Sequence, residues 1–451
     1  MYKKNLLILS LAAVLIVSFT ACKKWVDVEP PLQVGENTLL SNEQGFRDVL
    51  NGVYLQMGAI NSYGRDMTFG MMSVLGRSYD TTISPAIDNL FYQSARYNFQ
   101  DASVKTVQKN IWDNLYYAIG NLDNLLANIE SKKEVFSGNN YNTIKGEALG
   151  LRAFIHFDLL RMFAPSPAAA GFNVPAIPYV TRFSPYATAV STTGAVIDSC
   201  IADLKNAQTL LSDADMTTSR FTSWAVKGLL SRIYLYKGDF ASAQTNALSV
   251  ISSNKFPLAT VNTDLMFSKE HLFSLYSSIN ISLSYVKSVL NTAPPLGFTT
   301  QNQTALYVTG SGATSDWRKA LAFVDPATNG TSGNTISPRK FYASNANVLP
   351  LIRTTEMYYI AAECAVALND SLSATNWLDT VRVHRNVPKY TLAALKKDSL
   401  GVEIAKEYQK EFLGEGQVFF YYKRKNLPFT ALPYTKVAVV PNASYVFIKP
   451  E

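Results

Sequence analysis

The spacing of apolar residues predicts a chain built mainly from helices that pair with their neighbours. In "TSWAVKGLLSRIYLYKGDFASAQTNALSVI", Val226, Leu230 and Ile233 recur at i, i+4 and i+7, which places them on one helical face. Gly238 suits the left-handed end of this helix, and Asp239 suits the N-cap of the next one. Aromatic and small residues at fixed offsets around the "GDF" turn resemble a tetratricopeptide unit.

The same pattern predicts further helical pairs. "EMYYIAAECAVALNDSLSATNWLDTVRVHR" holds a second unit, with its polar turn at Asn369 and Asp370. "KTVQKNIWDNLYYAIGNLDNLLANIE" leads into "TIKGEALGLRAFIHFDLLRMFA", and "TGAVIDSCIADLKNAQTLL" leads into the helix of Trp224. The small residues Ala225 and Gly228 predict the close approach of another helix. We therefore predict an all-α fold of tetratricopeptide-like hairpins, about four pairs, with long irregular loops and a few short strands.

Three segments interrupt the helical pattern. Residues 62–100 are rich in Tyr, Phe, Met, Arg and Asp, and residues 164–193 are rich in Pro, Ala and Ser. Residues 258–350 mix β-prone runs ("LFSLYSSI", "ALYVTG") with turn residues. Long excursions from a regular scaffold usually carry binding sites, so the first and third segments are predicted to face a ligand.

The N-terminus is predicted to be an export signal. Lys3 and Lys4 precede an uncharged run from Leu6 to Phe19, whose 14 residues are fewer than the roughly 20 that span a bilayer. Cys22 follows two small residues, as in a bacterial lipobox, which predicts cleavage before Cys22 and lipidation of its thiol. We expect a signal peptide over residues 1–21, and a single domain over residues 22–451.

Composition narrows the possible partners. Charged residues make up only 17% of the chain and aromatic residues 12%, which suits stacking on uncharged ligands as well as a large core. The net charge of +7 is spread out, with no basic run longer than "KKEV" or "YYKRK", so nucleic acid is not expected as a partner. Cys200 and Cys364 lie among apolar neighbours and are expected to be buried thiols, although a disulfide between them is left open.

The sequence lacks the motifs of the common enzyme classes. His156, His271 and His384 are isolated from one another, and no nucleophile elbow, P-loop or dinucleotide fingerprint is present. His156 and His384 are interpreted as satisfied core residues. Glu407, Glu411 and Glu415 share one predicted helical face, but adjacent lysines and arginines favour a solvated or salt-bridged helix end over a glycosidase pair. We therefore predict a protein that is not an enzyme, with no cofactor and no metal site.

Charged residues on buried helices should have internal partners. Glu147 and Arg152 lie on the mostly apolar helix 145–163, and Arg353, Glu356 and Glu363 lie in a similar setting. We assign these residues to the integrity of the fold.

Motifs along the whole mature chain resemble the SusD/RagB family of surface lipoproteins. They are "CKKWVDVEP", "GFRDVLNGVY", "IWDNLYYAIGNLDNLL", "GEALGLRAFIHFDLLRMF", "RFTSWAVKGLLSRIYLYKGDFASA", "SDWRK", "IRTTEMYYIAAECA", "LDTVRVHR" and "EYQKEFLGEGQVFFYYKR". The resemblance implies capture of glycans at the outer membrane for a TonB-dependent transporter of the SusC type. It also implies a lipid anchor, a location facing outward and no catalysis.

Ligand contacts in such proteins come from aromatic and polar residues of the early and late loops. The principal candidates are Tyr63, Arg65, Asp66, Tyr92, Tyr285 and Trp317. Further aromatic candidates are Tyr79, Phe91, Tyr276, Phe298 and Tyr307. Sugar rings stack on aromatic faces, while Asp and Arg bond their hydroxyls. For each aromatic residue, core packing is an equally good interpretation. A peptide ligand, as in the RagB branch, and a surface adhesin or assembly factor without a small ligand are the alternatives.

Overall fold

The computed structural model describes residue 2 and residues 39–79, 85–86, 88–290, 296–307, 316–324, 335–342, 347–391, 395–433 and 437–450. Cys22 lies outside the described residues, as does the signal segment 1–21 apart from Tyr2. Cleavage and lipidation at Cys22 therefore stay predictions.

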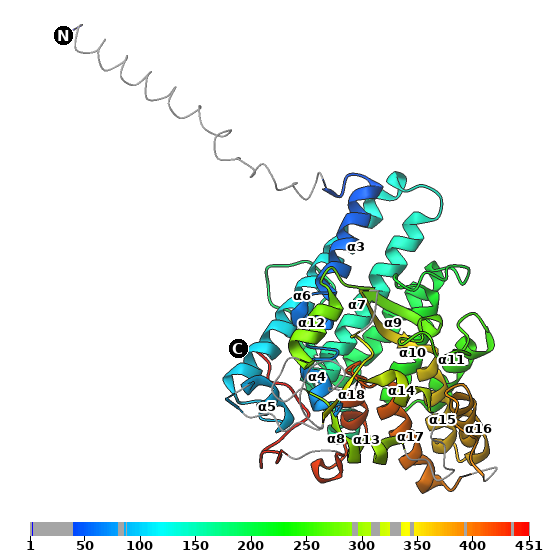
Figure 1. The fold of residues 1–451 in the computed structure, drawn as a ribbon. Coiled ribbons are helices and arrows are strands. Elements are labelled where there is room, and N and C mark those ends of the chain that lie inside the picture. Colours follow the sequence, from blue (N-terminus) through cyan, green and yellow to red (C-terminus); the bar gives the residue numbers. More distant parts are fainter. Residues whose placement is uncertain are drawn as a thin grey trace.

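Helices dominate the described chain, which confirms the prediction of an all-α fold (Figure 1). The longer helices are α3 (Glu43–Met57), α6 (Ala102–Ile129), α7 (Asn140–Phe163), α9 (Thr193–Leu210), α10 (Ser223–Lys237), α11 (Phe240–Ser252), α15 (Thr354–Ala367), α16 (Ser371–Val383) and α17 (Lys397–Glu411). The shorter ones are α4 (Met71–Leu75), α5 (Asn89–Ala95), α8 (Pro167–Ala170), α12 (Ile281–Tyr285), α13 (Thr300–Tyr307), α14 (Trp317–Ala322) and α18 (Gln417–Arg424). Single turns of 3₁₀ or π type are η1 (Ile60–Gly64), η2 (Glu130–Val135), η3 (Ser268–Glu270), η4 (Val286–Leu290) and η6 (Phe429–Ala431).

Short antiparallel strands form small separate sheets. They are β1 (Pro175–Pro178), β2 (Val190–Thr192), β3 (His271–Tyr276), β4 (Phe298–Thr299), β5 (Phe323–Val324), β6 (Thr335–Pro338) and β7 (Val348–Arg353). β1 pairs with β2, β3 pairs with β7, and β6 lies between β4 and β5. The β-prone run "LFSLYSSI" begins in β3 as predicted, whereas "ALYVTG" begins at the end of the helix α13.

The turns of the predicted hairpins follow from their cap residues. Gly238 ends α10 with a φ of 83°, and the Asp239 carboxylate accepts the Ser242 amide hydrogen 3.1 Å away to start α11. The α15–α16 turn repeats this device, with Asn369 at a φ of 64° and the Asp370 side chain accepting from the Ser373 amide at 2.9 Å. Both hairpins are confirmed at the predicted residues.

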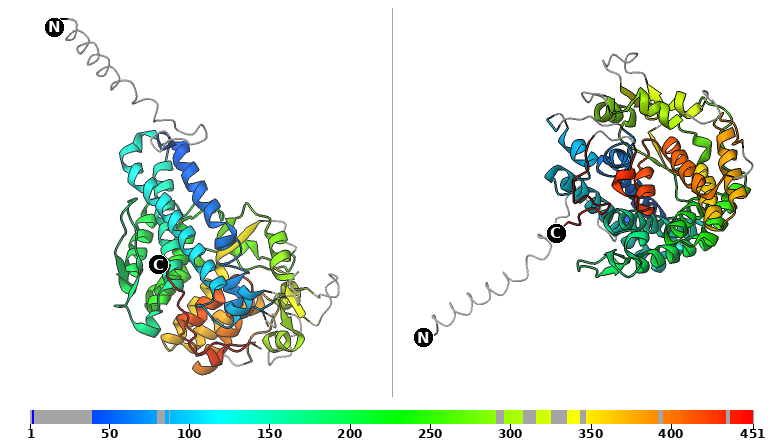
Figure 2. Two further views of the ribbon diagram at one scale, coloured as in Figure 1. Left: turned by 90° about the vertical axis from the view of Figure 1, so that its left-hand side faces the viewer. Right: turned by 90° about the horizontal axis from the view of Figure 1, so that it is seen from below.

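The paired helices form a continuous curved array. Successive helices pack on one another in the order α6, α7, α9, α10, α11, α15 and α16. Seen from below, the array follows an arc, and α18 lies on its inner side (Figure 2). Where the array begins, α3, α6 and α7 extend together away from the rest of the body (Figures 1 and 2). This arrangement matches the stacked hairpins that the sequence predicts.

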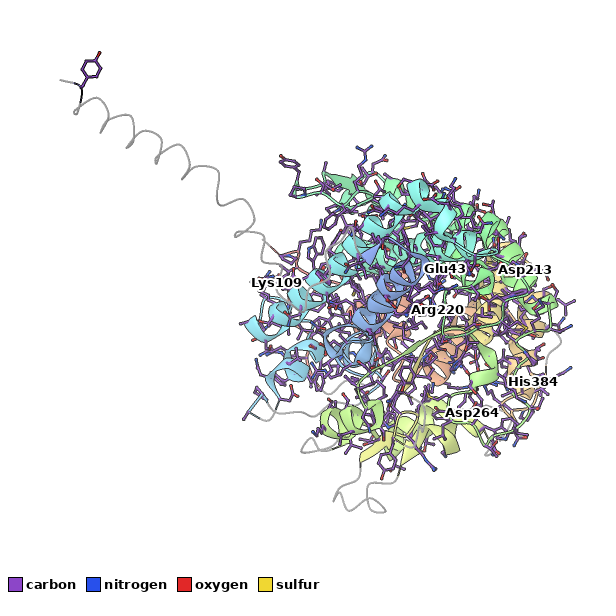
Figure 3. All side chains as sticks on the ribbon, turned by 90° about the horizontal axis from the view of Figure 1, so that it is seen from above. Glu43, Lys109, Asp213, Arg220, Asp264 and His384 are labelled. Atoms are coloured by element: carbon purple, nitrogen blue, oxygen red, sulfur yellow. The ribbon has the colours of Figure 1, made fainter. Side chains whose placement is uncertain are left out.

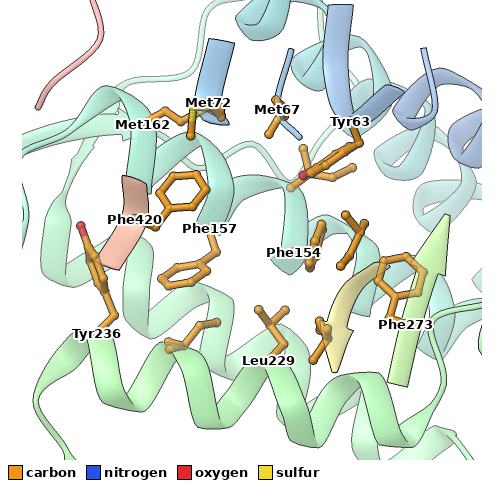
Figure 4. Close-up of a cluster of buried hydrophobic side chains, with 14 of the residues drawn as sticks. Tyr63, Met67, Met72, Phe154, Phe157, Met162, Leu229, Tyr236, Phe273 and Phe420 are labelled. Atoms are coloured by element: carbon orange, nitrogen blue, oxygen red, sulfur yellow. The ribbon is translucent and has the colours of Figure 1, made fainter. Parts of the chain in front are cut away.

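α7 lies at the centre of the core. Every residue of it from Gly146 to Phe163 is buried, as expected for a helix that is apolar almost all round. Phe154 and Phe157 project from α7 into a cluster of aromatic and aliphatic side chains that Figure 4 shows. The prediction that this helix is covered on several sides is confirmed.

The close contact expected at Gly228 is real, but its partner is a strand. A Cβ atom at Gly228 would lie 2.7 Å from Ile352 of β7 and 3.1 Å from Leu272 of β3. The prediction of a helix at Gly228 is wrong, because the paired strands β3 and β7 pack on α10 there. The third irregular segment is thereby fixed to the helical array.

Candidate functional site

The first predicted ligand residues lie in a compact turn after α3. Tyr63 is buried, and its hydroxyl donates a hydrogen bond to Asp158 Oδ2 on α7 at 2.7 Å. Figure 4 shows Tyr63 beside Phe154 in the core. Asp66 is buried as well, and Arg65 Nε bonds its Oδ1 at 2.7 Å. Burial raises the pKa of both the Tyr63 phenol and the Asp66 carboxyl. Of these three residues, only Arg65 keeps part of its side chain in solvent.

Tyr285 joins the two irregular segments through buried aromatic rings. Its ring meets Phe69 edge-on at 5.4 Å, and Phe341 lies 5.2 Å from Phe69 on another side. The Tyr285 hydroxyl donates to the carbonyl of Pro338. The structure therefore brings the first and third irregular segments together at Phe69, Tyr285 and Phe341. These rings form a packed core.

One glycine turn between α17 and α18 holds these segments in place. Gly414 has a φ of 78°, and its amide donates to Ser78 Oγ at 3.4 Å, while a Cβ atom at Gly414 would lie 3.3 Å from the Phe341 ring. Gly416 has a φ of 74°, and a Cβ atom on it would lie 2.2 Å from the Met67 carbonyl oxygen. Only glycine fits here, because the backbone of the first segment fills the space of a side chain.

Three predicted aromatic residues remain accessible. Tyr92 on α5 is half-buried under the Arg96 guanidinium, which lies 5.4 Å from its ring centre. Trp317 is half-buried at the start of α14, where its amide donates to the Arg385 carbonyl at 3.0 Å. Tyr276 ends β3 with 59% of its surface exposed. The three lie on different elements, α5, α14 and β3.

The remaining aromatic candidates are buried. They are Tyr79, Phe91, Phe298 and Tyr307. The Tyr79 hydroxyl donates to the Phe69 carbonyl at 2.6 Å, and Phe298 and Tyr307 pack with Leu306 and Leu413. In this conformation these rings serve packing, which was the alternative interpretation of each.

The three glutamates near the end of α17 are neither solvated nor on one helix. α17 ends at Glu411, and Glu415 lies in the turn that follows it. All three are buried and belong to a network of five carboxylates and five cations, namely Glu270, Asp316, Glu407, Glu411 and Glu415 with Arg318, Lys340, Arg353, Arg385 and Lys410. Of the two expectations for this helix end, the salt-bridged one is confirmed and the solvated one is wrong, because the cations, most of them from distant segments, enclose the carboxylates.

The distances within this network are those of strong ion pairs. Arg318 Nη1 lies 2.6 Å from Glu407 Oε2, and Arg353 Nη1 lies 2.8 Å from Glu411 Oε1. Burial alone would raise the pKa of Glu411, but the charges of Arg385 and Arg353 hold it well below its usual range. A general acid of a glycosidase needs a raised pKa and an open cleft. The geometry therefore favours a structural role for these glutamates.

The other charged residues of buried helices also have internal partners, as predicted, although Arg353 and Glu356 do not pair with each other. The partners are Arg220 for Glu147 at 2.8 Å, Asp203 and Asp123 for Arg152 at 2.8 and 2.9 Å, Arg232 for Glu356 at 2.6 Å, and Arg424 for Glu363 at 2.7 Å. Glu270 was missed as a network member, since nothing in "SKEH" marks its contact with Arg385.

The histidines and cysteines have structural surroundings. His156 is buried, its Nδ1 lies 2.9 Å from the Arg152 carbonyl, and its Nε2 accepts the Val180 amide hydrogen at 3.0 Å. His384 is only half-buried and lies at the edge of the molecule in Figure 3, so its assignment to the core is corrected. Cys200 and Cys364 are buried free thiols, as expected, and form no disulfide.

No group of three or more His, Cys, Asp or Glu side chains in the part of the chain that the structure describes is arranged to hold a metal ion. Within the described ranges, no helix combines the length and the apolar character needed to cross a membrane.

The folded chain is similar to proteins of known family. Residues 24–235 match the family model described as starch-binding associating with outer membrane, and residues 321–437 match the SusD family model. The SusD-like protein P2 of Formosa agariphila is 21% identical over 247 residues, which cover 53% of this chain and 45% of that protein. The match therefore spans less than half the length of this relative.

Solved structures share the fold. A SusD-like carbohydrate binding protein of Bacteroides vulgatus has a TM-score of 0.69 at 18% identity, covering 85% of this chain and 84% of that one. A SusD superfamily protein of Bacteroides thetaiotaomicron has a TM-score of 0.67 at 22% identity, covering 86% and 89%. The two family models match separate parts of one continuous fold. The chain therefore belongs to the SusD/RagB family.

Proposed function

We propose that this protein captures glycans at the cell surface and delivers them to a SusC-like TonB-dependent transporter of the outer membrane. The observation that carries the proposal is the match of residues 24–235 to the family described as starch-binding associating with outer membrane. The fold shared with the carbohydrate binding protein of Bacteroides vulgatus is consistent with it.

Accessible side chains on the irregular segments suit a sugar ligand. Arg65, Tyr92, Tyr276 and Trp317 keep part or most of their side chains in solvent. Aromatic faces stack on the C–H faces of sugar rings, and a guanidinium donates hydrogen bonds to hydroxyl groups. We assign ligand contact to these four residues. Tyr63, Asp66 and Tyr285 would act through packing beneath them, since they are buried in this conformation.

A capture role without catalysis agrees with the state of the buried carboxylates. Glu407 and Glu411 are enclosed by cations, and these charges hold both pKa values low against the effect of burial. Neither glutamate is free to donate a proton to a glycosidic oxygen at neutral pH. The chain would therefore bind a glycan and release it unchanged.

We further propose that Cys22 is lipidated, that residues 22–451 act as one domain outside the cell, and that the transporter is their partner. The delivery step is tested by affinity purification of the tagged full-length protein from outer membranes of its native host. Recovery of a TonB-dependent transporter in a stable ratio is expected. Recovery of adhesion or assembly components in its place would favour the alternative role as a surface adhesin or assembly factor.

A further inference from the structure

A groove distant in sequence from the predicted ligand loops lies between the end of α7 and the C-terminal segment. Its volume is about 510 Å³. Its lining comes from Pro165, Ser166, Ala169 and Ala170, from Lys423 and residues 426–429, and from residues 443–446. This volume is within the range of small-molecule sites, about 300 to 1,000 Å³. The groove has aliphatic and aromatic walls and a single charged lining residue, Lys423.

Lys423 has no carboxylate partner among the described residues. Its side chain is 2% exposed, and its Nζ donates to the Met162 carbonyl oxygen at 2.9 Å. The glutamates of α17 pair with other cations. Burial, and after it the charge of Arg161, hold the pKa of Lys423 well below its usual range.

The titratable groups that face Lys423 are few. Arg161 on α7 is held by Asp158, and Tyr445 in the groove wall donates its hydroxyl to the Leu427 carbonyl at 2.9 Å. α8 contributes no ionisable side chain to the lining. The ammonium form of Lys423 therefore has only a carbonyl dipole to stabilise it, and an anion in the groove would be its natural counter-ion.

Ser166 adds an unused hydrogen-bonding group to the same groove. The residue is 1% exposed, and its Oγ has no hydrogen-bond partner in the described part of the chain. Buried hydroxyl groups almost always have a partner, because leaving one unpaired costs about 1 to 3 kcal/mol. An unpaired hydroxyl in the lining of a groove that also holds a lysine without a carboxylate partner suits an incoming acceptor.

The aromatic wall completes the features of the groove. Phe429 and Tyr445 stack with their ring centres 4.6 Å apart and their planes 19° from parallel. Phe429 is half-buried, and Ser444 and Asn426 lie at the exposed rim. An aromatic face next to polar rim groups suits a pyranose ring, which has apolar C–H faces and hydroxyl edges.

We propose that this groove binds a sugar ring that carries a carboxylate, a uronic acid residue. The carboxylate pairs with the Lys423 ammonium and accepts a hydrogen bond from Ser166 Oγ, while the ring lies against the Phe429 side of the wall. The site is a second one, and it does not depend on the loops of the proposed function.

The test is calorimetric titration of the purified full-length protein with galacturonate and glucuronate, and with galactose and glucose as neutral counterparts. Acetate serves as the carboxylate without a ring. We expect saturable binding of a uronate, and weaker or no binding of the neutral sugars and of acetate.

Two variants and one control assign this binding to the groove. Lys423→Met should weaken uronate binding by about tenfold or more, the usual cost of a charged hydrogen bond. Ser166→Ala should weaken it by about tenfold and leave the thermal midpoint unchanged or higher, because the hydroxyl has no partner to lose. Lys425→Met, an exposed lysine on the same helix end, should bind as the native protein does.

Three results would overturn the proposal. They are the absence of saturable uronate binding, equal affinity for uronates and their neutral counterparts, and full uronate binding by the folded Ser166→Ala and Lys423→Met variants. A failure of the exposed loops to bind a neutral glycan would not change these outcomes. The proposed function and the groove site are therefore tested independently.

Discussion

Arg353 Nη1 and Glu411 Oε1 lie 2.8 Å apart where solvent reaches neither side chain, with exposures of 1% and 0%. The pair joins β7 to the end of α17 across 58 residues of sequence. The same arginine donates to Glu415 at 3.0 Å and so reaches the turn that holds the first irregular segment. The network therefore fixes the loops that carry the proposed ligand residues onto the helical array.

Breaking this pair should destabilise the protein strongly. Arg353→Met leaves Glu411 and Glu415 with fewer cations in a buried site, which usually costs about 3 to 5 kcal/mol. Urea unfolding followed by circular dichroism measures the loss. The matched control is Lys109→Met, which breaks an exposed pair with Asp113 and should cost about 1 kcal/mol or less. Equal losses from the two variants would contradict the structural role of the network.

Because the His156 imidazole is buried, we predict that the free energy of unfolding falls in mild acid. Burial lowers the pKa of His156 from 6.5 to about 3. In the folded chain its Nε2 is unprotonated, because it accepts the Val180 amide hydrogen. Between pH 6.5 and about 3, the unfolded chain binds a proton that the folded chain does not, so stability falls with falling pH by about 1.4 kcal/mol per unit.

Comparison with His156→Gln isolates this effect. Asp123 acts in the opposite direction, because burial raises its pKa to about 6 and the folded chain then holds the extra proton. This contribution is common to both proteins and cancels in the difference. Urea unfolding at pH 7.5 and pH 5 should show a larger loss for the native protein than for His156→Gln. Equal losses of stability in the native protein and in His156→Gln would rule out a neutral His156 in the folded chain.

Two of the positive-φ glycines, Gly416 after α17 and Gly238 after α10, offer a matched test of the turn after α17. Gly416→Ala should cost several kcal/mol, because its Cβ would lie 2.2 Å from the Met67 carbonyl oxygen. Gly238→Ala meets no atom within 4 Å at a φ of 83°, so it should cost only the conformational term of about 1 to 2 kcal/mol. Thermal unfolding of both variants checks the order. A Gly416→Ala protein as stable as Gly238→Ala would mean that the turn is not fixed on the first segment.

Much of the helical scaffold could be predicted from local sequence. Gly238 with Asp239, and Asn369 with Asp370, carry their turn and cap chemistry within a few neighbouring residues. The partners of buried charges could not be predicted, because Arg353 and Glu411 are far apart in sequence and several glutamates look equivalent. The same limit applies to the aromatic candidates. Tyr276 and Tyr285 are alike in sequence, yet one is exposed and the other is buried against Phe69.

Cys22 should be the point of attachment to the membrane. Replacement by alanine removes the only thiol next to the predicted cleavage site, so Cys22→Ala should take up no labelled palmitate. The native protein, labelled in cells in parallel, should carry the label. Continued labelling of the variant would exclude Cys22 as the lipidated residue.

The most direct measurement is a binding screen of the purified protein against plant, fungal and host polysaccharides and a peptide mixture, by calorimetry and affinity electrophoresis. The account predicts saturable binding of a glycan, no shortened product, and about 1 kcal/mol or more of lost affinity when Tyr276 or Trp317 is replaced by alanine. Exposed Tyr117 on α6, replaced in the same way, is the control. Release of cleaved glycan, binding of peptide alone, or no glycan binding even with the transporter present would contradict the proposed capture of glycans.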